Sequence, residues 1–177
     1  MEKKKKKKII RTFPLLEKLQ KADALQLDNR NNYQVPDYIK ENLNQKLRTY
    51  QHEAIRYFHY SQEMPMADDL ANQLLFHMAT GAGKTMVMAA LILYLYKEKN
   101  YQNFLFLVNT KGVVQKTKDN LLNTNSPKYL FTESLEIEGE RIFFVEKSQF
   151  PKHPEKNMIY IRIDTIQAVA SELNDVR

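Results

Sequence analysis

The chain has 177 residues, no cysteine and a formal net charge of +6, with 27 basic and 21 acidic residues. This length suits a single hydrophobic core, and the lack of cysteine excludes disulfides and thiolate metal sites. The run Lys3 to Lys8 contributes six basic residues, so the remaining 21 equal the acidic ones in number. Net charge therefore does not predict a nucleic-acid-binding surface. The lysine run fits either a solvated tail or a polyanion-binding arm.

The sequence contains neither an apolar segment long enough to cross a membrane nor a signal peptide. The basic residues 3 to 8 are followed by Arg11, Thr12 and Pro14, which interrupt any hydrophobic run. We therefore expect a cytoplasmic protein that makes no contact with a membrane.

The N-terminal third is expected to contain three short helical stretches and a linker. Leucines at helical spacing follow Pro14, and the residues between 27 and 36 are rich in Asn, Asp and Pro, which is typical of a linker. We place a boundary there, with residues 1–35 as a basic tail and short helical extension and residues 36–177 as the main domain. Two further helical patterns follow, one carrying Tyr38, Ile39 and Leu43, and one that starts near Thr49 or Tyr50 and directs Ala54, Ile55 and Phe58 inward.

Residues 73 to 96 show the pattern of a strand, a glycine loop and a helix. The short apolar run Leu74 to Met78 predicts a buried strand, and the helix that follows the loop continues to Tyr96. Gly81 and Gly83 allow positive φ angles, so that backbone N–H groups can face an anion at the positive end of the helix.

The loop carries the groups that a nucleotide requires. Lys84 supplies a positive charge for the β and γ phosphates, and the Thr85 hydroxyl can serve as a ligand of Mg²⁺. The full pattern has glycine where this chain has Met78. We predict that ATP and Mg²⁺ bind through residues Met78, Ala79, Thr80, Gly81, Ala82, Gly83, Lys84 and Thr85. A glycine turn that binds nothing is the structural alternative.

The remainder of the chain alternates between strand and helix patterns. Residues 104–108 form an unbroken apolar run that predicts a central strand, and a helix from Val113 to about Asn123 follows. Residues 141–145 and 158–163 predict two more strands, residues 150–157 a loop, and residues 166–173 a helix. This alternation predicts an α/β fold with a parallel sheet and right-handed crossovers.

Four segments, taken together, resemble the first RecA-like domain of superfamily-two DEAD/DEAH-box helicases and translocases. These segments are residues 47–55, 78–85, 104–110 and 164–167. Within that superfamily the chain is similar to ATPases related to the Res subunit of type III restriction enzymes. The resemblance covers residues 36 to 177. It implies a P-loop NTPase domain of the parallel-sheet, RecA-like type, with a short helical extension at its N-terminus.

The resemblance also implies roles for individual residues. Gln51 matches the glutamine that reads the edge of adenine, and its amide can both donate and accept, as adenine requires. Thr110 and Lys111 occupy the place of a loop that touches the nucleic-acid backbone, although Asn109 stands where many relatives have proline. Thr165 matches a residue that faces nucleic acid, and helix capping explains a threonine there equally well. Lys84 is the residue expected to act in catalysis.

The family hydrolyses ATP with an Asp-Glu pair, and this sequence contains no such pair. Asp164 is the only candidate for its aspartate, but Thr165 follows it, so the sequence favours a partial domain that stops before this motif. A second RecA-like domain, with its arginine fingers, and a nuclease signature are also not recognisable.

The expected function is therefore the ATP-binding part of a DNA-dependent helicase or translocase of a type III restriction-modification system. Its expected partners are double-stranded DNA and a modification methyltransferase subunit. Two alternatives stay open at this point, a nucleic-acid-binding P-loop module without catalysis and a P-loop kinase.

Overall fold

The structure is a computed structural model that describes residues 14–24, 33–63 and 73–175. The chain divides into two compact units, each described here by itself. One comprises Met1–Gln34 and Arg56–Leu74, and the other comprises Val35–Ile55 and Leu75–Arg177. The boundary expected after residue 35 stays a prediction. The lysine run lies outside the described residues, as does most of the expected linker.

The first unit contains α1 (Pro14–Ala24) and the second part of α3 (Thr49–Glu63). The helix predicted behind Pro14 is confirmed, and its Leu19 is buried. Within the same unit the rings of Tyr33 and His59 stack with their centroids 3.9 Å apart, and the side chain of Tyr60 is buried. Aromatic packing is therefore a main contribution to the core of this unit.

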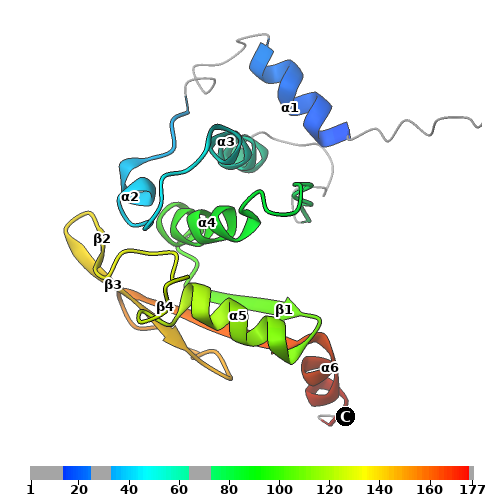
Figure 1. Ribbon diagram of the computed structural model, residues 1–177, viewed down its shortest axis with the longest axis vertical. Coiled ribbons are helices and arrows are strands. Elements are labelled where there is room, and N and C mark those ends of the chain that lie inside the picture. Colours follow the sequence, from blue (N-terminus) through cyan, green and yellow to red (C-terminus); the bar gives the residue numbers. More distant parts are fainter. Residues whose placement is uncertain (1–13, 25–32, 64–72, 176–177) are drawn as a thin grey trace, which may run out of the picture. The chain divides into compact units, whose positions relative to one another are not determined.

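The second unit is built on a four-stranded sheet with the order β1-β4-β3-β2 (Figure 1). Its strands are β1 (Asn103–Val108), β2 (Leu135–Ile137), β3 (Glu140–Glu146) and β4 (Met158–Thr165). The β1–β4 and β3–β4 pairs are parallel, and the β2–β3 pair is an antiparallel hairpin. The predicted α/β fold is confirmed, and the predicted parallel sheet holds for β1, β4 and β3, whereas the antiparallel β2 was not predicted.

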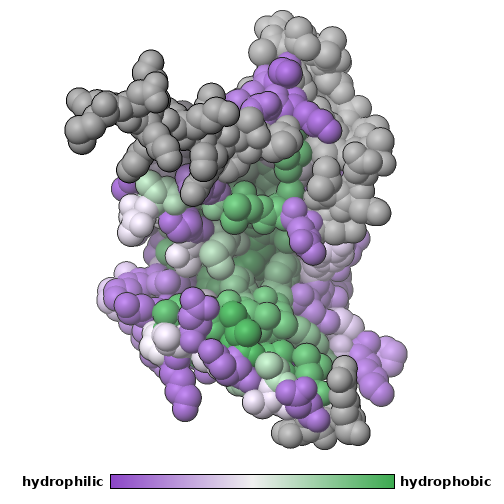
Figure 2. Space-filling model, turned by 90° about the vertical axis from the view of Figure 1, so that its right-hand side faces the viewer, coloured by the Kyte–Doolittle hydropathy of each residue, from purple (hydrophilic) through white to green (hydrophobic). Residues whose placement is uncertain are grey.

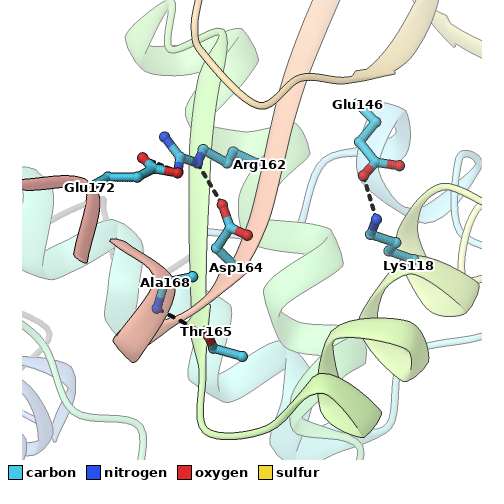
Figure 3. Close-up of polar contacts among 7 residues, drawn as sticks. All are labelled: Lys118, Glu146, Arg162, Asp164, Thr165, Ala168 and Glu172. Atoms are coloured by element: carbon cyan, nitrogen blue, oxygen red, sulfur yellow. Dashed lines mark hydrogen bonds and ion pairs between the residues drawn. The ribbon is translucent and has the colours of Figure 1, made fainter. Parts of the chain in front are cut away.

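One face of the sheet is covered and forms the core of this unit. Ile159, Ile161 and Ile163 alternate along β4 and are buried on this face. Helix α5 (Lys111–Leu121) contacts both β4 and β1, and the ion pair between Lys118 and Glu146, at 2.6 Å, joins this helix to β3 (Figure 3). Three of the four strands predicted from apolar runs are confirmed, as is the helix that begins after them, α6 (Ile166–Asp175).

Helix α4 (Lys84–Lys99) is the most deeply buried helix of the described chain, with eight buried residues between Met86 and Tyr94. It ends at Asn100, whose left-handed conformation (φ 56°) and N–H bond to the carbonyl of Leu95 form a C-terminal cap. The short helix α2 (Asp37–Lys40) packs against α4. The phosphate loop, residues 79–85, therefore leads directly into a helix that is held on most of its surface.

The segment after α2 does not continue as a helix, so the expected helical face with Leu43 is wrong beyond Lys40. Instead Leu43 forms an antiparallel bridge with Phe131. The buried Asn42 explains the change, because its side chain donates to the carbonyls of Tyr38 and Glu136 and accepts from the N–H of Glu136. These bonds fix an extended backbone that leads toward α3. The start of α3 at Thr49 and the burial of Ile55 confirm the next predicted helix.

Two expectations about strands are wrong. Residues 74–78 form no regular strand, and the side chain of Leu75 is 86% exposed. In addition, β1 lies at an edge of the sheet, not at its centre. The physical reason is common to both, since a strand needs a hydrogen-bonded neighbour, and the described residues supply none for residues 74–78 or for the outer edge of β1. An apolar run in the sequence indicates burial, but it does not indicate which strand will be the hydrogen-bonded neighbour.

Candidate nucleotide-binding site

The phosphate loop has the backbone conformation that the sequence predicted. Gly81 and Gly83 have φ angles of +79° and +74°, the left-handed region in which a side chain is unfavourable. Gly83 is the N-cap of α4, and no side chain caps the first turn of this helix. Uncapped N–H groups at the start of a long helix carry partial positive charge, so this loop is suited to an anion.

Lys84 is held across the mouth of the loop. Its Nζ donates to the carbonyls of Met78 at 3.0 Å and Ala79 at 2.9 Å. An ammonium group has three hydrogens, so one remains for a ligand while two fix its position. The carbonyl of Ala79 also accepts from the N–H of Ala82 at 3.2 Å, which closes the loop as a tight turn. The positive charge is therefore preorganised beside the helix start.

Gln51, on α3, is brought directly to this loop although 27 residues separate it from Met78 in the sequence. Its Nε2 donates to the carbonyls of Ala82 at 3.2 Å and Gly83 at 3.3 Å, and its Oε1 accepts from the N–H of Arg48 at 2.8 Å. The side chain is only 4% exposed. The structure thus joins the predicted adenine-reading residue to the predicted phosphate loop through hydrogen bonds.

His52, the residue after Gln51, has a shifted pKa. Burial, followed by the positive charge of Lys40, lowers the pKa of His52 from its ordinary value. His52 therefore stays neutral to a lower pH than a free histidine and adds no positive charge next to Gln51 at neutral pH.

The predicted Mg²⁺ ligand, Thr85, is partly exposed in the first turn of α4. Within the described ranges, no group of three or more His, Cys, Asp or Glu side chains could hold a metal ion. Mg²⁺ that binds together with a nucleotide takes most of its ligands from phosphate and water, so the role of Thr85 stays a prediction.

The residues predicted to touch nucleic acid lie together at one end of the sheet. Val108 and Thr165 are paired in the register of β1 and β4, so Thr110 and Lys111 follow at the same edge. Thr110 caps α5 by accepting from the N–H of Val113 at 3.4 Å, and Thr165 accepts from the N–H of Ala168 in α6 at 3.2 Å (Figure 3). Both threonines therefore serve as helix caps, and Lys111 is exposed beside them.

Asp164, the candidate for a magnesium-binding aspartate, is engaged elsewhere. Its Oδ2 accepts from Nε of Arg162 at 2.8 Å, and the guanidinium of Arg162 also donates to both carboxylate oxygens of Glu172 in α6 (Figure 3). These two carboxylates raise the pKa of Arg162, Glu172 having the larger effect. Asp164 is therefore engaged by Arg162, and Thr165 follows it where an Asp-Glu pair would have glutamate.

A cavity of about 370 Å³ lies at the C-terminal end of α4, and none of the predicted site residues lines it. Its charged rim is internally paired, with Lys97 bonded to Glu138 and Lys156 bonded to Glu140 at 2.5 Å. The phosphate loop is the stronger candidate, because it combines the uncapped start of α4 with an ammonium group that bonds to carbonyls, whereas the lysines of the cavity are paired with acids.

Sequence reasoning missed three features of this unit. The contact from Gln51 to the loop depends on tertiary structure, and Arg162 had no motif to mark it. The hairpin of β2 and β3 had a usable signal, namely Gly139 between two stretches of alternating apolar residues. Glu138 and Gly139 both adopt positive φ angles in this two-residue turn.

The sheet, the glycine loop and the helix that starts from it define the chain as a P-loop NTPase domain of the RecA-like α/β class. Residues 44–176 match the family described as type III restriction enzyme, res subunit, and the chain belongs to this family. It is 33% identical over 160 residues to the probable type III restriction-modification enzyme HindVIP Res subunit of Haemophilus influenzae. That match covers 87% of this chain and 30% of the relative, so the chain spans about a third of the relative's length. No solved structure matches the chain.

Proposed function

We propose that this chain is the ATP-binding part of a DNA-dependent helicase or translocase of a type III restriction-modification system. The observation that carries the proposal is the loop geometry, in which Gly81 and Gly83 have positive φ, Lys84 is fixed over the loop and the start of α4 is uncapped. Membership of the Res family supports the same class of activity.

Different residues of this chain would bind different parts of the nucleotide. The N–H groups of the loop and the free hydrogen of Lys84 bind phosphate, Thr85 contributes a hydroxyl to Mg²⁺, and Gln51 contacts adenine. ATP with Mg²⁺ supplies a phosphoanhydride bond whose hydrolysis can drive movement. Oε1 of Gln51 retains a lone pair after accepting from Arg48, which suits the exocyclic amine of adenine.

The proposed track is double-stranded DNA, bound at the edge of the sheet where Thr110, Lys111 and Thr165 lie. Two helices, α5 and α6, begin at this edge, and backbone N–H groups at helix N-termini are common donors to DNA phosphates. The name of the Haemophilus relative includes both restriction and modification, which supports a modification methyltransferase as partner. No described helix has the length and apolarity to cross a bilayer. We propose a cytoplasmic location because the DNA substrate is there.

Calorimetric titration of the chain with ATP tests the core of the proposal. We expect saturable binding in the presence of Mg²⁺ and weaker binding after its removal with EDTA, because Thr85 and the phosphates share the ion. Failure of ATP to bind under either condition would reject the nucleotide-binding function. Binding that does not respond to Mg²⁺ would reject the role of Thr85 alone.

A further inference from the structure

Gln51 donates hydrogen bonds to the backbone of the phosphate loop, and these bonds affect how the loop can bind phosphate. Its Nε2 donates to the carbonyl of Ala82 at 3.2 Å. A peptide unit is planar and trans, so the carbonyl of Ala82 and the N–H of Gly83 point in opposite directions. A donor that holds this carbonyl therefore directs the N–H of Gly83 away from Gln51.

The second contact acts in the same sense on the next peptide unit. Nε2 of Gln51 also donates to the carbonyl of Gly83 at 3.3 Å, and the N–H groups of Met86 and Val87 approach the same oxygen. The N–H of Lys84 is consequently directed opposite to this carbonyl, toward the start of the helix. Two successive donors are thus aligned at the position where α4 presents its positive end.

The orientation of the amide is fixed at its other end. Oε1 accepts from the N–H of Arg48 at 2.8 Å, so the carbonyl side of the amide faces α3 and the NH₂ side faces the loop. The fit is close, because a Cβ atom built on Gly83 would lie 2.5 Å from Nε2 of Gln51. Position 83 therefore needs glycine for two reasons, its φ angle of +74° and the space taken by Gln51.

We propose that Gln51 is a positioning residue for phosphate: it fixes the N–H groups of Gly83 and Lys84 in the orientation that binds a polyphosphate, independently of any base. This inference rests on the proposed nucleotide binding. It differs from adenine reading because it predicts that Gln51 affects a ligand that has no base.

The experiment uses tripolyphosphate with Mg²⁺ and the chain labelled with ¹⁵N-glycine. The four glycines give four amide signals, those of Gly81 and Gly83 reporting on the loop and that of Gly139, in the turn between β2 and β3, serving as the internal reference. In the parent, tripolyphosphate should shift the signals of Gly81 and Gly83. Gln51→Met keeps the length of the side chain but not its donors. In this variant the amide signal of Gly83 without tripolyphosphate should differ from that of the parent, and tripolyphosphate should bind about 3- to 10-fold more weakly.

Gln115→Met is the matched control, since Gln115 is exposed on α5 and its amide contacts only Asp119 among the recorded bonds of the described residues. It should leave the Gly83 signal and the tripolyphosphate affinity unchanged. If Gln51→Met does not fold, as judged by circular dichroism, Gln51→Glu replaces it. That variant keeps the volume and the acceptor for Arg48 but lacks the NH₂ donor and adds a negative charge. The test with this variant is therefore the position of the Gly83 signal before tripolyphosphate is added, which should move as in Gln51→Met.

The outcomes separate the two proposals. Tripolyphosphate that shifts neither Gly81 nor Gly83 in the parent would reject the phosphate loop itself. Shifts in the parent together with equal affinities in the folded Gln51 variant would overturn the positioning role and leave the phosphate loop intact. If a Gln51 variant keeps its tripolyphosphate affinity but loses its preference for ATP over GTP, Gln51 recognises adenine and does not position the phosphate loop.

Discussion

We expect phosphate binding to depend most on Lys84. Replacing it with alanine removes a charged donor that the structure already holds at the loop. A hydrogen bond to a charged group contributes about 1.5 to 3 kcal/mol, so Lys84→Ala should weaken ATP binding by roughly 10- to 150-fold. Titration calorimetry measures the loss, and circular dichroism should remain unchanged because the side chain is exposed.

The matched control for Lys84 is Lys116→Ala, which removes an exposed lysine from α5. It should leave ATP binding at the level of the parent. Equal ATP affinity in the parent and in Lys84→Ala would contradict the assignment of the phosphate loop.

Gln51 is expected to give the site its preference for adenine. Guanine presents an acceptor where adenine presents an amine, so with GTP at least one buried polar group loses its partner, at a cost of about 1 to 3 kcal/mol. The parent should therefore prefer ATP to GTP by roughly 5- to 150-fold, and Gln51→Ala should lose most of that preference. Parallel titrations with the two nucleotides measure it. Equal affinities in the parent would end the adenine-reading role.

At the scale of elements, α5 is the part that should meet DNA. Lys111, at its first turn, is exposed at the edge of the sheet. Lys111→Ala should weaken binding of duplex DNA uniformly across sequences and reduce the salt slope of the affinity by about one. Fluorescence anisotropy at several salt concentrations measures this slope. The control is Lys128→Ala, which removes an exposed lysine from a loop. If Lys111→Ala leaves the salt slope unchanged, α5 is not part of the DNA-binding surface.

Local pattern predicted the elements well where each element is fixed by its own residues. The periodicity of apolar residues located α1, α3, α4 and α6, and apolar runs located β1, β3 and β4 within one or two residues of their observed ends. The failures share a non-local cause. Residues 74–78 carry a strand-like run without a paired neighbour, and the contact of Gln51 with Ala82 joins positions that no local pattern connects.

The backbone of the phosphate loop was predicted better than the place of β1 in the sheet, because the residues of the loop are contiguous in sequence. The spacing of the glycines alone indicated positive φ at Gly81 and Gly83. By contrast, the balance of charge around Asp164 could not be predicted, since it depends on Glu172 reaching Arg162 from α6. A carboxylate becomes available or unavailable to a metal through such tertiary contacts.

At the scale of the whole molecule, binding and hydrolysis of ATP should separate. The 177 residues contain the groups proposed to bind phosphate but no Asp-Glu pair, and the carboxylate of Asp164 is paired with Arg162. We expect little or no release of phosphate from Mg·ATP by this chain, with or without duplex DNA. A coupled phosphate assay measures it. Steady turnover at about 1 s⁻¹, an ordinary enzyme rate, would show that another residue positions the attacking water.

Hydrophobic side chains remain exposed on the sheet-bearing unit, near the bottom of the view in Figure 2. On β1, Leu105 and Leu107 are 45% and 49% exposed, and β1 pairs only with β4 among the described residues. Exposed apolar residues on an unpaired strand edge are typical sites of association between chains.

Hydrogen–deuterium exchange of the individual amides of β1 should distinguish the side that pairs with β4 from the opposite side. The N–H of Tyr160 bonds to the carbonyl of Gln102, and in a parallel ladder this contact fixes the direction of every following amide. The amides of Phe104 and Phe106 then point toward β4 and should exchange slowly, whereas those of Leu105 and Leu107 point outward and should exchange quickly. Slowing of Leu105 and Leu107 as the protein concentration rises would mean that this edge has recruited a strand from another molecule.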